Sequence, residues 1–214
     1  MTSMNKRRDG GDTKTRILEE AYREFCGNGY KGGDINVIVN KAGLTKGAMY
    51  HYFKGKEDLA DAVLDTIITE RIIENWIKPL GSGANPIDVL QEITACPEGE
   101  NGLKELQQLA DQARLMIELS QLNAGFHRKV LQISDRLLRA IAGALRDARE
   151  RDEINTDVVP EKSAAQILSF FIGGTMLSKS LPVADVYRDC REQLKDYLES
   201  MRRQSGRHYR RAQC

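Results

Sequence analysis

The feature of this 214-residue sequence that most constrains its fold is a pair of short amphipathic segments joined by one glycine, between residues 34 and 53. Asp34 and Thr45 are both favourable helix N-caps. Gly43 lies between the segments, where a tight turn needs a left-handed residue. We therefore predict a short helix after Asp34, a turn at Gly43 and a second helix from Lys46 to about Phe53, which together form a helix-turn-helix. The first of these helices has one apolar stripe, formed by Ile35, Ile38, Val39 and Ala42.

The rest of the chain also has helical periodicity, and no segment sustains a period-two alternation of apolar and polar residues. We therefore predict an all-α fold of about nine helices. The first helix is expected to begin near Thr13 and to stop at Asn28 and Gly29. The remaining predicted helices cover residues 57–78, 87–95, 103–122, 125–151, 164–179 and 183–201.

Charge is distributed unevenly along the chain, although the net charge is only +1. Residues 1–59 carry 11 Lys+Arg and 8 Asp+Glu, whereas residues 60–199 carry 16 and 23. A basic N-terminal module is therefore masked by an acidic body. We predict a flexible basic arm (1–12), a helix-turn-helix domain (13–56), a larger helical domain (57–201) whose helix 57–78 connects the two, and a basic, disordered tail (202–214).

Composition excludes several classes of protein. No apolar run approaches the roughly 18 residues of a membrane helix, and the N-terminus lacks the apolar core of a signal peptide, so we expect a cytoplasmic protein without a membrane partner. The four cysteines have no CxxC spacing and no nearby histidine pairs. We expect free thiols, no metal and no cofactor.

Residues 13–59 contain the two segments TKTRILEEAYREF and DINVIVNKAGLTKGAMYHYFKGKEDL. In these segments the chain resembles the DNA-binding domain of the TetR family of transcriptional regulators. It implies a homodimer that binds DNA with the first three helices of each subunit, and a larger body that binds a small molecule. It further implies a repressor that leaves a palindromic operator when that ligand binds.

The chemistry of the second short helix fits such a role. Gly47 and Ala48 leave its leading edge nearly bare, which allows the backbone to approach a major groove closely. Tyr50 and His51 offer hydrogen-bond groups to phosphates, whereas Met49 is expected to face inward with Phe53. Tyr52 has two alternatives, a DNA contact or a place in the three-helix core. Lys54 and Lys56 are expected to form a phosphate clamp with the backbone amides at the start of the next helix.

The predicted DNA contacts combine this chemistry with positions carried over from the family. Thr45 is expected to use its hydroxyl on the helix or on a phosphate, and Asn36 matches a position that can reach a base. Gly33 and Asp34 stand where many relatives have Thr or Ser; the aspartate would cap the helix but would repel phosphate. The full predicted set is Asn36, Thr45, Lys46, Gly47, Ala48, Tyr50, His51, Lys54 and Lys56.

The body offers less specific signals. A pocket between helices is mostly apolar with a few polar groups, and on this basis the ligand-binding candidates are Trp76, Cys96, Met116, Phe126 and Phe170. Each aromatic ring could equally be plain core. Three alternatives remain open: a noncovalent ligand, redox or electrophile sensing by Cys96, or no effector. An enzyme using Cys96 and His127 lacks a group to orient the base, so we predict no catalytic residues.

Dimerisation is predicted on the last two helices. Their apolar side chains recur at helical spacing, although the core of a monomer could use the same stripe. Two-fold pairing is favoured because one helix-turn-helix makes few base contacts. The predicted interface residues are Ile167, Leu168, Phe171, Ile172, Leu194 and Leu198.

Overall fold

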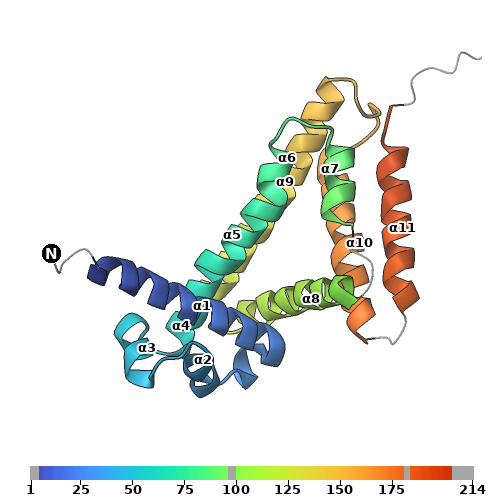
Figure 1. The fold of residues 1–214 in the computed structure, drawn as a ribbon. Helices are drawn as coiled ribbons and strands as arrows, with labels where there is room; N and C mark the ends of the chain where they lie inside the picture. Colours follow the sequence, from blue (N-terminus) through green and yellow to red (C-terminus); the bar gives the residue numbers. More distant parts are fainter. Residues whose placement is uncertain (1–4, 96–99, 181–183, 204–214) are drawn as a thin grey trace, which may run out of the picture. The chain divides into compact units, whose positions relative to one another are not determined.

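The computed structural model describes residues 5–95, 100–180 and 184–203, and these ranges are helical apart from turns, short loops and one isolated β-bridge (Figure 1). Within them the chain forms nine continuous helical runs, which confirms the predicted all-α class. No helix of the described ranges is long and apolar enough to cross a membrane. Cys96 and residues 204–214 of the predicted tail lie outside the described residues.

The chain divides into two compact units. The first consists of Met1–Glu74 and Cys96–Arg136, and the second of Asn75–Ala95 and Leu137–Cys214. The predicted boundary between residues 56 and 57 falls inside the first unit, so the helix-turn-helix shares its unit with part of the body. The functional domain division stays a prediction.

The first unit is built around α1 (Asn5–Gly32), which packs against α2 (Ile35–Lys41), α4 (Lys56–Val63) and α8 (Glu100–Ser120). The buried stripe of α1 includes Ile17, Ala21 and Phe25, which have no exposed surface. Helix α1 begins at Asn5 rather than near Thr13, so residues 5–12 are helical, and the flexible arm stays a prediction. The interruption predicted near its end occurs at Gly29, where φ is 77° and ψ is 164°.

The connecting helix is one continuous run with two π-helical segments. It consists of α4, η1 (Leu64–Ile68), α5 (Thr69–Ile72), η2 (Ile73–Ile77) and α6 (Lys78–Leu80). The Thr69 hydroxyl donates to the Leu64 carbonyl five residues earlier, at 2.9 Å. A side-chain donor inserted among the backbone carbonyls is a recognised cause of such irregular turns.

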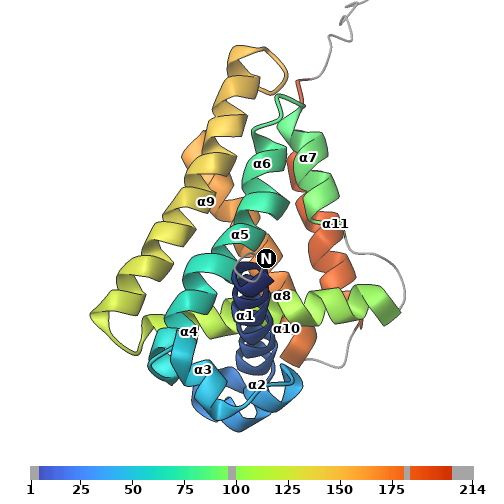
Figure 2. The ribbon, with the colours of Figure 1, turned by 60° about the vertical axis from the view of Figure 1, so that its left-hand side comes forward.

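In the second unit, α10 (Pro160–Ser180) and α11 (Ala184–Ser200) pack side by side, and α7 (Pro86–Ile93) lies against α11 (Figure 2). Helix α9 (Ala124–Glu150) contributes its C-terminal half. The end of α11 is tied down by an antiparallel bridge between Ile154 and Arg202 and by the Asn155 amide, which donates to the Met201 carbonyl at 2.8 Å. This unit therefore has a helical core of its own.

Candidate nucleic-acid interface

The turn between α2 and α3 (Lys46–Tyr52) forms as the sequence predicts. The Asp34 carboxylate accepts from the Asn36 amide at 2.7 Å and caps α2. Gly43 has φ of 66°, which is the left-handed conformation expected there. The Thr45 hydroxyl accepts from the Ala48 amide at 3.2 Å, so this oxygen is used to cap α3.

Helix α3 has two chemically distinct faces. Met49 is fully buried and Phe53, at the C-cap, is 3% exposed, so both hold the helix against the core as predicted. On the other side, Tyr50 is 52% exposed. The structure thus places most of the predicted contact residues of α3 in solvent. The exposed set is Lys46, Gly47, Tyr50 and His51, with Ala48 half-buried.

Tyr52, which the sequence left between two alternatives, is half-buried. Its ring packs edge-on against the ring of His51, with centroids 5.3 Å apart and an interplanar angle of 81°. Tyr52 therefore lies at the margin of the exposed face, where it orients the His51 ring by contact.

Asn36 is exposed at the start of α2, but its amide is already engaged. Its Nδ2 donates to Asp34 Oδ1 at 2.9 Å, the same oxygen that caps the helix. The glycine that precedes Asp34 also has a structural cause, because a Cβ at Gly33 would lie 2.6 Å from Phe25 Cδ1. The Gly-Asp pair that departs from the family pattern is therefore explained by helix capping and by packing against Phe25.

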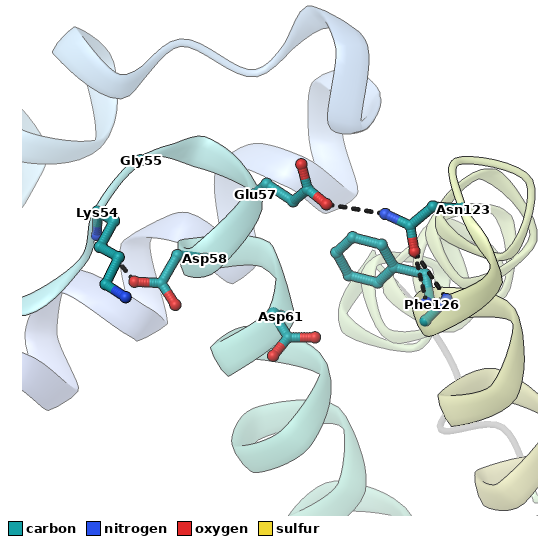
Figure 3. Close-up of a pocket in the computed structure, with 8 residues that line it drawn as sticks. Lys54, Gly55, Glu57, Asp58, Asp61, Asn123 and Phe126 are labelled. Atoms are coloured by element: carbon teal, nitrogen blue, oxygen red, sulfur yellow. Dashed lines mark hydrogen bonds between the residues drawn. The ribbon is translucent and has the colours of Figure 1, made fainter.

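The predicted phosphate clamp is arranged differently from the expectation. The Lys54 amide donates to Asp58 Oδ2 at 2.8 Å, so this backbone group is occupied by a carboxylate of α4, the helix that follows it (Figure 3). The Lys56 ammonium donates to the Lys31 carbonyl at 3.0 Å and lies 5.1 Å from the centroid of the Tyr30 ring. Lys56 is therefore held by the end of α1, and Lys54 keeps an exposed side chain.

Sequence reasoning missed Glu24, which organises the helix-turn-helix from α1. Only 3% of Glu24 is exposed, and its carboxylate accepts from Asn28 Nδ2 at 2.8 Å and from the ammonium of Lys41 at 3.4 Å. In the sequence, Glu24 stands among the apolar residues Tyr22, Phe25 and Cys26, on the side of the amphipathic helix that is buried. This position is the sequence feature that could have identified Glu24.

A pocket of about 490 Å³ opens beside the start of α4, and Figure 3 shows its lining. Asn123 bridges its two sides: Nδ2 donates to Glu57 Oε1 at 2.8 Å, and Oδ1 accepts from the Phe126 amide at 3.0 Å. Asp61, also in the lining, accepts from the ammonium of Lys129 at 2.7 Å. The residues that line the pocket are Lys54, Gly55, Glu57, Asp58, Asp61, Asn123, Gly125 and Phe126.

Among the predicted ligand-binding residues that the structure describes, which leaves out Cys96, Phe126 alone lines this pocket. Trp76 is buried edge-on against Phe171 in the second unit, with ring centroids 5.1 Å apart. Met116 and Phe170 are half-buried, and the Phe170 ring is tilted against Tyr197. Within the described ranges, no group of three or more His, Cys, Asp or Glu side chains could hold a metal ion.

The predicted dimer stripe is mostly the protomer's own core. Leu198 and Ile167 are fully buried, and Ile172 is the exception, at 40% exposed. The reason is that α10 and α11 pack on each other and that Phe171 packs on Trp76. Five of the six predicted interface residues are buried within the protomer, and their place at a dimer interface stays a prediction: Ile167, Leu168, Phe171, Leu194 and Leu198.

Comparison with known proteins agrees with this geometry. Residues 17–63 match the family model described as bacterial regulatory proteins, tetR family. The chain is 35% identical over 83 residues to YxaF of Bacillus subtilis (strain 168), an uncharacterized HTH-type transcriptional regulator, in a match that covers 38% of this chain and 42% of that relative. The matched stretch therefore spans less than half of the relative's length.

Two solved structures share the fold over most of the chain. A TetR transcriptional regulator from Chloroflexus aurantiacus J-10-FL superposes with a TM-score of 0.75 at 23% identity, covering 92% of this chain and 98% of its own. A protein from Saccharomonospora viridis, solved in complex with choline, has a TM-score of 0.76 at 18% identity and coverages of 91% and 100%. The helix-turn-helix thus resembles that of the tetR family of bacterial regulatory proteins over residues 17–63, and the described helices share the fold of a TetR transcriptional regulator.

Proposed function

We propose that this protein is a sequence-specific DNA-binding transcriptional regulator that reads the major groove with α3. The observation that carries the proposal is the division of α3 into a buried face at Met49 and an exposed face at Lys46, Gly47 and Tyr50. A bare leading edge, a cation and a phenol hydroxyl on one accessible side are what a groove-binding helix requires. The role is binding, and the proposal includes no catalytic step.

The regulator is proposed to act as a homodimer on a palindromic operator. Helix α10 supports this with two apolar side chains that stay accessible in the protomer: Ile172 is 40% exposed and Leu177 is 46% exposed. Ser169 and Ala165, one and two turns before Ile172, are also exposed on α10. Small and apolar side chains on one helix face suit close packing against a second copy related by two-fold symmetry.

A small-molecule effector is proposed to release the protein from DNA, which makes it a repressor. The pocket at Phe126 is the first place to test, because it adjoins Lys54 and the start of α4. Its lining has more carboxylates than cations, which favours a positively charged ligand, and choline is the ligand of one structural neighbour. The alternatives are sensing by Cys96 and regulation without an effector.

The proposal is tested by selecting duplexes from a random-sequence library with the full-length protein and sequencing them. A two-fold symmetric motif with half-sites about one helical turn apart is expected. Recovery of no enriched sequence would overturn the proposed function. For the effector, choline is added to the protein in a thermal-shift measurement, where binding to the folded state raises the melting temperature; an unchanged melting temperature would remove choline as the effector.

A further inference from the structure

The end of α1 contains a break that is capped from another helix. At Gly29 the backbone leaves the helical conformation, with φ of 77° and ψ of 164°, and a turn of helix follows up to Gly32. A helix break leaves carbonyls before it and amides after it without their helical partners. Such groups must be satisfied from elsewhere or by water.

Helix α8 supplies the partners for both sides of this break. Glu118 accepts from the Tyr30 amide through Oε2 at 2.8 Å and from the Lys31 amide through Oε1 at 3.0 Å. Four residues earlier, on the same face of α8, the Arg114 guanidinium donates to the Cys26 carbonyl. One carboxylate and one guanidinium thus cap the amides after the break and a carbonyl before it.

The glycine at the break is what lets these side chains approach. A Cβ at Gly29 would lie 2.9 Å from Glu118 Oε2 and 3.1 Å from Arg114 Nη1. Any other residue at this position would displace both caps and would also be strained by the positive φ. The break, the glycine and the two caps therefore form one structural unit, which we call the α1 clamp (Gly29, Arg114 and Glu118).

The segment fixed by the clamp also holds Lys56. The Lys31 carbonyl accepts from Lys56 Nζ at 3.0 Å, and the Tyr30 ring lies below the same ammonium at 5.1 Å. The Tyr30 ring is in turn packed against Phe25, with centroids 5.8 Å apart. A lysine ammonium has three donors, so two remain for phosphate oxygens when one is bound to Lys31.

We propose that Glu118 and Arg114 are positioning residues for DNA binding, which set operator affinity by fixing the segment that holds the Lys56 ammonium. The inference rests on the proposed function, because it takes Lys56 as a phosphate contact. Neither side chain touches DNA in this account. They act because an ammonium already held in place loses less side-chain freedom when it meets a phosphate.

The test is a double-mutant cycle in DNA binding, with a duplex selected by the wild-type protein as the probe. Glu118→Gln leaves one acceptor where two amides donate, and Lys56→Met removes the ammonium. Each single change is expected to weaken binding about fivefold. Each is also expected to make the negative slope of log affinity against log salt shallower by about 0.9, the value for one phosphate contact. Because both act through Lys56, the double variant is expected to be about fivefold weaker, not about 25-fold.

Two further variants keep the test decisive. Glu105→Gln makes the same charge change at an exposed position of α8 and is expected to leave affinity and salt slope unchanged. Arg114→Gln removes the other cap of the clamp and is expected to show the same non-additivity with Lys56→Met, which covers the case in which Glu118→Gln fails to fold. Thermal melts of each variant confirm that it is folded under the conditions of the binding measurement.

The outcomes separate this inference from the proposed function. If the wild-type protein selects no DNA, the proposed function fails and the inference falls with it. If the wild type binds its selected duplex but Glu118→Gln and Arg114→Gln bind as tightly, the inference alone is overturned. The inference would also be overturned if the losses of affinity in the single variants multiply in the double variants, while the salt slope of Glu118→Gln and of Arg114→Gln stays that of the wild type.

Discussion

Met49 and Tyr50 are neighbours in α3 but face opposite environments: Met49 is fully buried, and Tyr50 is 52% exposed. The Met49 side chain packs in the core and so fixes the position of α3. The Tyr50 side chain presents its hydroxyl to solvent or to a bound partner. Stability and DNA binding should therefore be separable by changing one residue or the other.

Changing Met49 to Ala should destabilise the protein, because it leaves a cavity in a fully packed site. The expected loss in the free energy of unfolding is about 2–5 kcal/mol. Tyr50→Phe keeps the ring and removes only the exposed hydroxyl, so stability should stay within about 0.5 kcal/mol while DNA binding weakens several-fold. Urea denaturation and a DNA titration of both variants check this pair. Equal losses of stability in the two variants would contradict the assignment of faces.

Two glycines of the helix-turn-helix should respond oppositely to alanine. Gly43→Ala must adopt φ near 66° and bring a Cβ to 3.0 Å from Arg16 Nη2, so a loss of about 1–2 kcal/mol is expected. Gly47 lies in α3, and the nearest atom to a Cβ there is Thr45 Oγ1 at 3.8 Å. Gly47→Ala should therefore gain about 0.4–1 kcal/mol of stability and lose DNA affinity. A Gly47→Ala protein that binds DNA as well as the wild type would show that the groove does not approach this backbone.

Cys26 should resist alkylation in the folded protein. Burial, with a smaller opposing effect from the hydrogen bond of Tyr22, raises the pKa of the Cys26 thiol to about 12. The thiolate is the reactive form, and at pH 8 such a group is ionised to only about one part in ten thousand. Iodoacetamide labelling followed by mass spectrometry should modify the half-buried Cys190 before Cys26, and both should react after denaturation. Rapid labelling of Cys26 in the native protein would contradict its burial.

Acid should weaken the end of α11 through Glu199. The hydrogen bonds from Arg202 and then from Gln91 hold the pKa of the Glu199 carboxyl below its usual range. A lowered folded-state pKa gives stability that is present above the unfolded-state pKa, near 4.3, and is lost as pH falls through the folded value. The melting temperature of wild type should therefore fall more steeply on acidification below about pH 5 than that of Glu199→Gln. Glu192→Gln, an exposed change on the same helix, should follow wild type; identical acid profiles for all three proteins would refute the role of Glu199.

Patterns within a few turns of helix could be predicted from the sequence, because local periodicity and capping decide them. The caps at Asp34 and Thr45, the turn at Gly43 and the inward direction of Met49 were all predictable in this way. They account for the accuracy of the helix-turn-helix prediction.

Contacts between distant segments could not be predicted. Glu118 caps amides that lie 88 and 87 residues away, and nothing in the local sequence of either partner marks the pair. The same limit applies to the predicted dimer interface. Apolar residues at helical spacing, such as those around Ile167 in α10 and Leu198 in α11, identify a buried face. They do not tell whether that face is covered by the same chain or by a second one.

The most direct test of the central claim is a gel-shift titration of the selected duplex with wild type, Lys46→Ala and Tyr50→Ala. Both side chains are exposed on α3, so the variants should melt within a few degrees of wild type. If α3 lies in the major groove, each variant should bind at least about fivefold more weakly, the loss of about 1–3 kcal/mol expected for one good contact. Unchanged affinity in both folded variants would contradict the assignment of α3 as the recognition helix.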